Sequence, residues 1–111
     1  MLNQVMLVGR LTEEVKVEKG ENGVNNSSLV LAVPRNFKNA DGVYDTDFIN
    51  VKLFGTVATN TIEYCKKGDI ISIRGRIQTK EIEKYHTKMQ IQEIIADRVT
   101  FLSMHEKGDN K

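Results

Sequence analysis

Hydrophobic and polar residues alternate along most of this chain, which is the pattern of β-strands that bury one face. The alternation covers residues 47–54, 70–80 and 88–101, while the mainly apolar runs at residues 5–11 and 29–33 predict two further strands, the second of them buried. The charged stretch over residues 12–18 is expected to continue the first strand after a bend. Pro34 is expected to end the second strand, because proline cannot donate a hydrogen bond to a neighbouring strand. The last strand is expected to bend near Ile94 and Ile95, where the alternation slips.

One segment between these strands has the spacing of a helix instead. Over residues 55–68 the apolar positions recur every three to four residues. They are Ala58, Ile62 and Cys65. Thr56 is expected to cap the start of this helix, and residues 66–68 favour its end. Tyr64 and Cys65 are interpreted as packing residues of the helix.

Three strands, a helix and two strands, in this order, are the layout of a five-stranded, all-β OB-fold barrel with one short helix between strands three and four. Turns predicted at residues 20–23 and 39–42 separate the first three strands. A small open sandwich with one covering helix would give a similar order. The chain of 111 residues fits one domain. We place this domain at residues 1–103 and a short C-terminal extension at residues 104–111.

The strand over residues 47–54 carries two different rows of side chains. Its apolar row, which suits a core, consists of Ile49, Val51 and Leu53. Its other row consists of Phe48, Asn50, Lys52 and Phe54. Aromatic rings stack on unpaired bases and lysine attracts phosphates, so this second row is typical of a surface that binds single-stranded nucleic acid. Burial of both phenylalanines at the two ends of the strand is the alternative interpretation.

Composition narrows the classes of protein that this chain can represent. The hydrophobic content of 40% supports one modest core, and the net charge of +1 does not decide on a nucleic-acid partner, because local charge matters more. The apolar runs are too short to cross a membrane and no signal segment opens the chain, so a cytoplasmic protein is expected. Cys65 is the single cysteine and lies far in sequence from His86 and His105. No disulfide, metal site or cofactor is therefore expected.

Several short segments resemble bacterial single-stranded DNA-binding proteins. They are residues 3–11, 31–33, 46–49, 53–55, 67–69, 75–79 and 93–97, in the family's order over nearly the whole chain. The resemblance implies an OB-fold domain that binds and protects single-stranded DNA with little sequence preference. It also implies a role in DNA replication, recombination or repair, and a location at the nucleoid.

The resemblance also implies roles for individual aromatic residues. Stacking platforms are implied at Phe37, Phe48 and Phe54. Two further positions at which the family commonly has aromatic residues hold Ile82 and Gln90 here. Tyr85, near the tip of the last hairpin, is a candidate replacement. A stacked base contributes about 1–3 kcal/mol, so the loss of one platform is expected to weaken binding without abolishing it.

Basic residues on the predicted strands and loops are candidates for contacts with phosphates. They are Arg10, Arg35, Lys38, Lys52, Lys67, Arg74, Arg76, Lys80 and Lys88. Lys52 is the strongest candidate, because the phenylalanines on either side define its face. Lys84 and Lys88 lie close to two glutamates in the sequence, which predicts a mixed-charge hairpin surface.

The first strand is apolar on both faces. Its central residues are Val5, Met6, Leu7 and Val8. One small barrel covers only one face of a strand, so the other face is expected to bind a second copy of the chain. A symmetric dimer through this oligomer interface is the minimum assembly, and the resemblance extends it to a homotetramer.

Residues 103–111 differ from the tail that many members of the family carry, which ends in a short acidic and apolar tip that recruits replication and repair enzymes. Here the residues are mixed in charge and the last one is a lysine. Recruitment of enzymes through a tail is therefore not expected. A phage or mobile-element paralogue, an accessory paralogue and a domain separated from a longer chain each fit this pattern.

Two functions of other classes stay open. A primosome-type OB protein would act mainly as a protein-interaction adaptor at replication restart. A nuclease would use carboxylates such as Asp45, Asp47 and Glu93 around a metal ion. These carboxylates form no evident cluster in the sequence and two of them suit a turn, and nothing near Cys65 supplies the base that a nucleophile needs. We therefore expect no catalytic residue and no enzymatic activity.

Overall fold

The computed structural model describes residues 1–19 and 25–103. The turn predicted at residues 20–23 and the extension at residues 104–111 therefore lie outside the described residues. In chain order the elements are β1 (Val5–Leu11), β2 (Lys16–Lys19), β3 (Asn25–Lys38), β4 (Tyr44–Phe54), α1 (Gly55–Tyr64), β5 (Ile70–Lys84) and β6 (Thr87–Ser103). This order agrees with the predicted one when β1 and β2 are taken as the two halves of a bent first strand.

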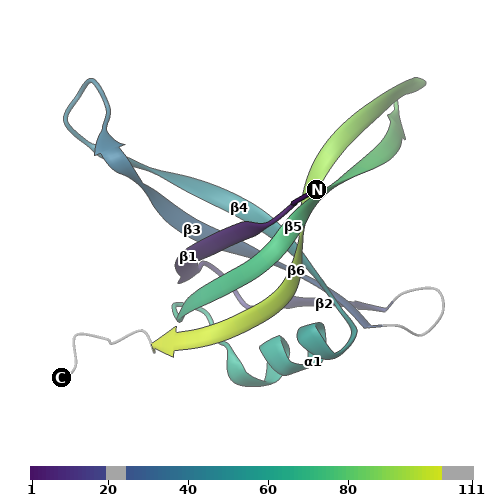
Figure 1. Cartoon of the computed structure of the whole chain (residues 1–111), viewed down its shortest axis with the longest axis horizontal. Coiled ribbons are helices and arrows are strands. Elements are labelled where there is room, and N and C mark those ends of the chain that lie inside the picture. Colours follow the sequence, from purple (N-terminus) through teal and green to yellow (C-terminus); the bar gives the residue numbers. More distant parts are fainter. Residues whose placement is uncertain (20–24, 104–111) are drawn as a thin grey trace.

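The strands close into a barrel (Figure 1). Around it, β1 pairs with β5, β5 with β6, β6 with β4, β4 with β3, and β3 returns to β1. Strands β4 and β6 are parallel and the other pairs are antiparallel. The closing contact places Leu11 of β1 opposite Leu31 of β3. This closure confirms the five-stranded OB-fold barrel and excludes the open sandwich.

The core forms where the inward rows of the strands meet. Its fully buried members are Leu11, Leu29, Leu31, Val51, Leu53, Ala58, Ile71 and Ile73, each at most 1% exposed. The strand members occupy alternate positions, as the sequence pattern predicts. Ile77, predicted to lie on the inner row with Ile71 and Ile73, is exposed because β5 extends past the barrel at that point. Helix α1 supplies Ala58 and covers one end of the barrel (Figure 1).

The start of helix α1 differs from the prediction. The helix begins at Gly55, and Phe54 is the N-cap residue, without a side-chain capping hydrogen bond. Thr56 is therefore a residue of the first turn and not the cap. Gly55 has a φ of 60°, a conformation that glycine adopts without strain, and this permits the sharp change from strand to helix.

The packing face of helix α1 also differs in part. Ala58 and Cys65 are buried as predicted, but Thr61 lies between them, while Ile62 and Tyr64 are exposed. The Thr61 hydroxyl donates a hydrogen bond to the backbone carbonyl of Val57 at 2.7 Å. Because its polar group is satisfied within the helix, Thr61 is accepted on the buried face of the helix, where the apolar pattern had predicted Ile62.

Two hairpins extend beyond the barrel as arms (Figure 1). We refer to residues 33–47 as the β3–β4 arm and to residues 77–94 as the β5–β6 arm. Contrary to the prediction, β3 does not end at Pro34, which lies opposite Thr46. Beyond Ala32, β3 pairs with β4 alone, and proline is tolerated in a strand with a free edge.

The β5–β6 arm is longer than predicted, because β5 continues to Lys84 and β6 begins at Thr87. Tyr85 and His86 form the two-residue turn between them, with φ values of 52° and 62°. Positive φ at both central residues is the requirement of a type I′ hairpin turn, whose twist matches that of the strands.

The irregularity predicted in the last strand is a bulge at Asp97. Arg98 lies opposite Arg74 and Ala96 lies opposite Gly75, which leaves Asp97 as the extra residue. It is located slightly farther along the strand than the predicted bend. A Cβ atom on Gly75 would overlap the backbone carbonyl of Ile95, so glycine is needed where the two strands approach.

Candidate nucleic-acid interface

Both rows predicted for β4 are present in the structure. Val51 and Leu53 are fully buried and Ile49 is half-buried. Phe48 and Phe54, on the opposite row, are 66% and 44% exposed. The interpretation in which both rings fill the core is therefore wrong, and two large apolar rings lie on the outer surface of the barrel.

Small side chains of β3 lie next to this exposed row. Ala32 is the cross-strand partner of Phe48, and Ser28 is that of Lys52. Because these neighbours are short, Phe48 stands above the surface of the sheet, while Lys52 is half-buried. An extended polymer has room to lie along β4 and to contact both.

Arg10 extends the surface onto β1. It lies opposite Ala32, which lies opposite Phe48, so the three residues form a row across three strands. A groove of about 350 Å³ borders this row and is lined by Gly9, Arg10, Ala32, Pro34, Thr46 and Ile70. The Arg10 guanidinium donates a hydrogen bond to the carbonyl of Gly68 at 3.0 Å. This contact holds the positive charge beside the groove.

Lys52 connects the aromatic row to the other side of the barrel. It lies beside Ile95 of β6, and Ile95 lies opposite Arg76 of β5. Arg76 is paired with Asp97, with 2.6 Å between Nη1 and Oδ1. Lys52 itself makes no ion pair with any residue that the structure describes. Its charge is therefore uncompensated between two exposed rings.

The β5–β6 arm has two chemically different faces, because directly opposite residues of a hairpin share a face. One face carries the pairs Lys80 with Ile91, Ile82 with Met89, and Lys84 with Thr87. The other carries Glu81 with Gln90 and Glu83 with Lys88. Lys88 thus lies on a mixed-charge surface as predicted, whereas Lys84 shares the basic and apolar face of Lys80. The prediction for Lys84 was wrong because sequence proximity to glutamates does not define a face.

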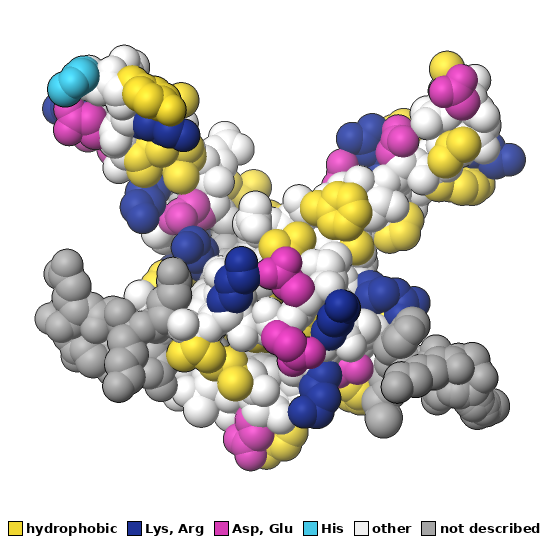
Figure 2. Space-filling model, turned by 180° about the vertical axis from the view of Figure 1, so that it is seen from behind, with side chains coloured by type: hydrophobic (Ala, Val, Ile, Leu, Met, Phe, Trp, Pro, Cys, Tyr) yellow, Lys and Arg dark blue, Asp and Glu magenta, His cyan; other side chains and the backbone are white. Residues whose placement is uncertain are grey.

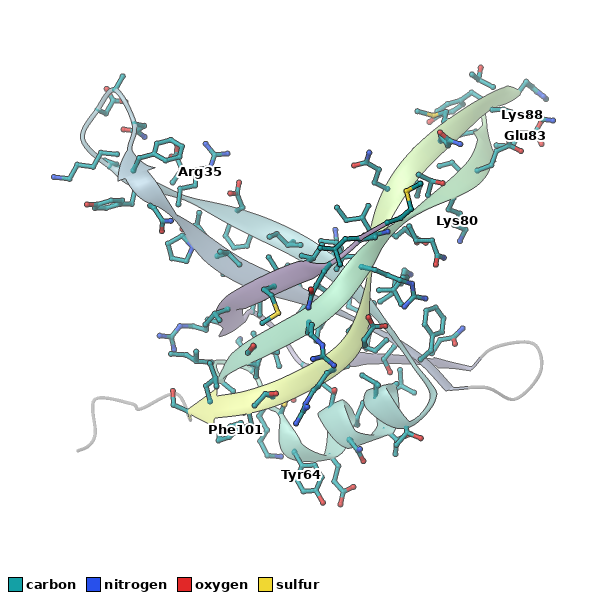
Figure 3. All side chains as sticks on the ribbon, viewed as in Figure 1. Arg35, Tyr64, Lys80, Glu83, Lys88 and Phe101 are labelled. Atoms are coloured by element: carbon teal, nitrogen blue, oxygen red, sulfur yellow. The ribbon has the colours of Figure 1, made fainter. Side chains whose placement is uncertain are left out.

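Side chains on the arms can be followed in the figures. Seen from behind, the β5–β6 arm, which carries the histidine in cyan at its tip, shows hydrophobic, basic and acidic side chains together (Figure 2). Lys80 lies nearer to the barrel than Glu83 and Lys88, which lie close to the tip (Figure 3). At the turn, the Lys84 ammonium lies 5.6 Å from the centroid of the Tyr85 ring.

Arg35 is engaged by carboxylates of the same arm. Its Nε and Nη2 donate to the two carboxylate oxygens of Asp47 at 3.1 and 2.9 Å, and its Nη1 lies 3.7 Å from Asp45. The hydrogen bond from Arg35 lowers the pKa of the Asp47 carboxyl below its ordinary value. Asp47 alternates with Phe48 along β4, so this cluster lies on the opposite side of the arm from the aromatic row.

Phe37, Lys38 and Tyr44 lie farther along the β3–β4 arm. Phe37 is exposed and belongs to the irregular stretch between Pro34 and Lys38. Lys38 lies opposite Tyr44, and its ammonium is 5.7 Å from the centroid of the Tyr44 ring. The sequence interpretation missed Tyr44, although the alternation on β4 continues back to it from Phe48.

Comparison with known proteins places these features in a family. A model of the Single-strand binding protein family matches residues 2–102. The chain belongs to this family. Single-stranded DNA-binding protein 1 of Staphylococcus aureus (strain MSSA476) is 39% identical over 112 residues, which cover 100% of this chain and 72% of the relative. Single-stranded DNA-binding protein B of Bacillus subtilis (strain 168) is 41% identical over 103 residues, or 92% of this chain and 91% of the relative.

Solved structures of single-strand binding proteins have the same barrel. The wild-type single-stranded DNA-binding protein from Thermus aquaticus matches 92% of this chain with a TM-score of 0.79 and 27% identity, and this chain spans about half, 50%, of its length. The Plasmodium falciparum SSB in complex with ssDNA matches 93% of this chain and 96% of its own with a TM-score of 0.77. Its identity of 23% limits that likeness to the fold. The primosome-type adaptor gains no support from these relatives.

Two of the basic residues predicted for the site lie apart from the aromatic row in this member of the single-strand binding protein family. Arg74 lies opposite Met6 of β1 and opposite Arg98 of β6, so it borders the candidate oligomer surface. Lys67 lies in the connection between α1 and β5, where its backbone amide donates to the carboxylate of Glu14 at 3.0 Å. Neither contact places these side chains beside the β4 row.

The candidate oligomer surface on β1 is narrower than predicted. Met6 and Val8 are 61% and 53% exposed. Val5 and Leu7 are half-buried on the inner side, and Leu7 packs against the core. Only Met6 and Val8 of the four predicted residues therefore offer apolar surface to a partner.

Among residues 1–19 and 25–103, no three His, Cys, Asp or Glu side chains gather in a way that could hold a metal ion. Asp45 and Asp47 are strand residues that bind Arg35 and form no nuclease cluster with Glu93. Asp45 also accepts a hydrogen bond from the Asn39 amide at 3.1 Å, so it supports the adjacent turn, whereas Asp47 does not have the turn role considered from the sequence. Burial raises the pKa of the Cys65 thiol. No helix in the described part of the chain is long and apolar enough to span a membrane.

Proposed function

We propose that this chain binds single-stranded DNA with little sequence preference, by stacking bases on aromatic rings and pairing phosphates with basic side chains. The observation that supports this most directly is the exposed row of β4, in which Phe48 and Phe54 flank Lys52. The two rings are six residues apart, which corresponds to about 20 Å along an extended strand. A single strand that follows β4 therefore meets a ring, a cation and a second ring in succession.

Unpaired bases explain why the ligand is a single strand. Every base has a flat face that stacks on an aromatic ring, whereas the bases of a duplex already stack on one another. Stacking does not depend on base identity, so little sequence preference is expected. Phe37 is the third proposed platform, on the β3–β4 arm.

The basic residues are proposed to follow the same path. Lys52, Arg10 and Lys80 lie on the outer surface or on the basic face of the β5–β6 arm, and Lys38 lies beside Tyr44. Arg76 has part of its charge compensated by Asp97. Arg35, Arg74 and Lys67 are proposed to contribute less, because their neighbours lie away from the β4 row.

The biological role proposed is the protection of single-stranded DNA during replication, recombination or repair, without catalysis. A complex between several copies supports such a role, since linked sites bind a long strand with higher avidity than one site. We propose a homo-oligomer formed through Met6 and Val8, with a homotetramer as the full assembly. The cytoplasmic location expected from the sequence stays a prediction.

A titration with fluorescently labelled oligo-dT and with duplex DNA of equal length, at one salt concentration, tests the function. We expect tight binding of the single strand and much weaker binding of the duplex. The logarithm of affinity should fall with the logarithm of salt concentration, with a slope of about −0.7 for each phosphate neutralised. Equal affinity for both ligands would reject the proposal, and DNA cleavage in the presence of Mg²⁺ or Mn²⁺ would reject the non-catalytic role.

A further inference from the structure

Tyr44 is an aromatic residue of the β3–β4 arm that lies on the exposed row of β4. Burial alternates without interruption from Tyr44 to Phe54, so Tyr44 shares its side of the strand with Phe48 and Phe54. Its ring is 54% exposed. It lies four positions before Phe48, which corresponds to about 13 Å along the strand. Tyr44 therefore extends the aromatic row beyond the barrel and onto the arm.

The Tyr44 ring contacts a cation and lies next to a hydrogen-bonded turn. Lys38 lies opposite it across the arm, and the Lys38 ammonium is 5.7 Å from the ring centroid, which is within the range of a cation–π contact. The neighbouring turn is held by Asn39, whose side-chain oxygen accepts hydrogen bonds from the amides of Asp41 and Val43 at 2.8 and 3.0 Å. A ring on an ordered arm loses little conformational freedom when a base stacks on it.

Charges on the β3–β4 arm are distributed so that the Tyr44 side is basic. Asp45 and Asp47 alternate with Tyr44 along β4 and bind Arg35 on the other side of the arm. Figure 3 shows Arg35 projecting from the arm toward the space between the two arms. Lys38 is the charged residue that lies next to the ring. A phosphate near Tyr44 therefore meets a cation, while the carboxylates of Asp45 and Asp47 are engaged by Arg35.

The two strands of the β5–β6 arm carry no aromatic residue on which a base could stack. Ile82 lies opposite Met89 on its basic face, and Gln90 lies on its other face opposite Glu81. Tyr85 is confined to the turn at the tip. The exposed rings of β4 thus form a line from Phe54 through Phe48 to Tyr44, and Phe37 lies on the neighbouring strand β3.

We propose that Tyr44, together with Lys38, is an additional stacking site for single-stranded DNA, and that the strand runs along β4 onto the β3–β4 arm. This inference rests on the proposed function and specifies the path of the bound strand along β4. Tyr44 stacks on a base and Lys38 pairs with an adjacent phosphate.

The tyrosines of this chain provide a direct test, because it has three tyrosines and no tryptophan. Stacking on a base quenches tyrosine fluorescence. In the double variant Tyr64→Phe with Tyr85→Phe, Tyr44 is the single emitter, and saturation with oligo-dT should quench its emission. In the matched variant Tyr44→Phe with Tyr85→Phe, the single emitter is Tyr64 on helix α1, and its emission should change little.

Affinity for labelled oligo-dT, measured on the same samples, separates the two proposals. Tyr44→Ala should weaken binding by about five-fold or more, the low end of the contribution of one stacked base, while Tyr44→Phe should keep most of the affinity. Lys38→Gln should reduce both affinity and the salt dependence. Binding of labelled oligo-dT without quenching of Tyr44 would overturn this inference and leave the proposed function standing. No binding by the unmodified chain would overturn both.

Discussion

Arg35 donates hydrogen bonds to both carboxylate oxygens of Asp47, at 3.1 and 2.9 Å, across the β3–β4 arm. This two-point contact compensates the charge of Arg35 on the side of the arm that does not carry Phe48. Arg35 lies two positions before Phe37 in the sequence, but its charge is already paired within the arm. Arg35 and Lys52 are exposed and half-exposed cations on adjacent strands. They differ in their neighbours, because Arg35 lies against carboxylates and Lys52 makes no ion pair with a described residue.

The first prediction compares these two cations. Lys52→Ala should weaken oligo-dT binding and reduce the slope of its salt dependence by about 0.7, because one phosphate contact is lost. Arg35→Ala should change both quantities less, because its charge is already paired. Fluorescence anisotropy titrations at several salt concentrations measure both effects. An Arg35→Ala defect as large as that of Lys52→Ala would contradict this assignment.

The second prediction concerns the titration of Asp47. Its pKa lies below the ordinary value of 3.8, because Arg35 donates to the carboxylate. A carboxyl with a lowered folded-state pKa contributes stability above its unfolded value, and this contribution is lost as the pH falls through the folded-state pKa. Carboxyl ¹³C NMR should locate the midpoint below 3.8 in the unmodified chain and nearer to 3.8 in Arg35→Gln. An unchanged midpoint in the variant would show that the contact does not persist in solution.

The third prediction separates binding rings from core residues. Phe37→Ala, Phe48→Ala and Phe54→Ala should each weaken oligo-dT binding by about 1–3 kcal/mol and leave the melting temperature nearly unchanged, because the rings are exposed. Leu53→Ala, on the buried row of the same strand, is the matched control. It should lower the free energy of unfolding by about 2–5 kcal/mol and leave the affinity of the folded fraction unchanged. Large losses of melting temperature in the phenylalanine variants would mean that the faces are assigned wrongly.

The fourth prediction addresses assembly. Val8→Lys places a charge in the exposed apolar row of β1 and should reduce the molar mass measured by light scattering, since a buried unpaired charge destabilises an interface. Thr79→Lys, on the β5–β6 arm and away from β1, serves as the control and should leave the mass unchanged. A monomeric unmodified chain at micromolar concentration would reject the oligomer, and a stable dimer would retain the β1 contact while removing the tetramer.

The sequence by itself determined the features that depend on one strand at a time. Alternation places Phe48 and Phe54 on one row and Val51 and Leu53 on the other whatever the neighbouring strands are, because successive side chains point to opposite faces. The order of strands and helix predicted the barrel but left an open sandwich as an alternative, which the pairing of β1 with β3 excluded. Family resemblance then added the roles of the rings, which periodicity alone did not provide.

Only the tertiary structure decided which residues lie opposite one another. Register and bulges place Arg35 against Asp47, Arg74 against Met6 and Lys84 on the face of Lys80. They also allow β3 to continue past Pro34 and bring Lys38 to the ring of Tyr44. Most of these relationships depend on how two strands pair, so the pattern along a single strand does not encode them. The physical reason is that a shift of pairing by one residue changes every neighbour and reverses every face, while the composition of each strand stays the same.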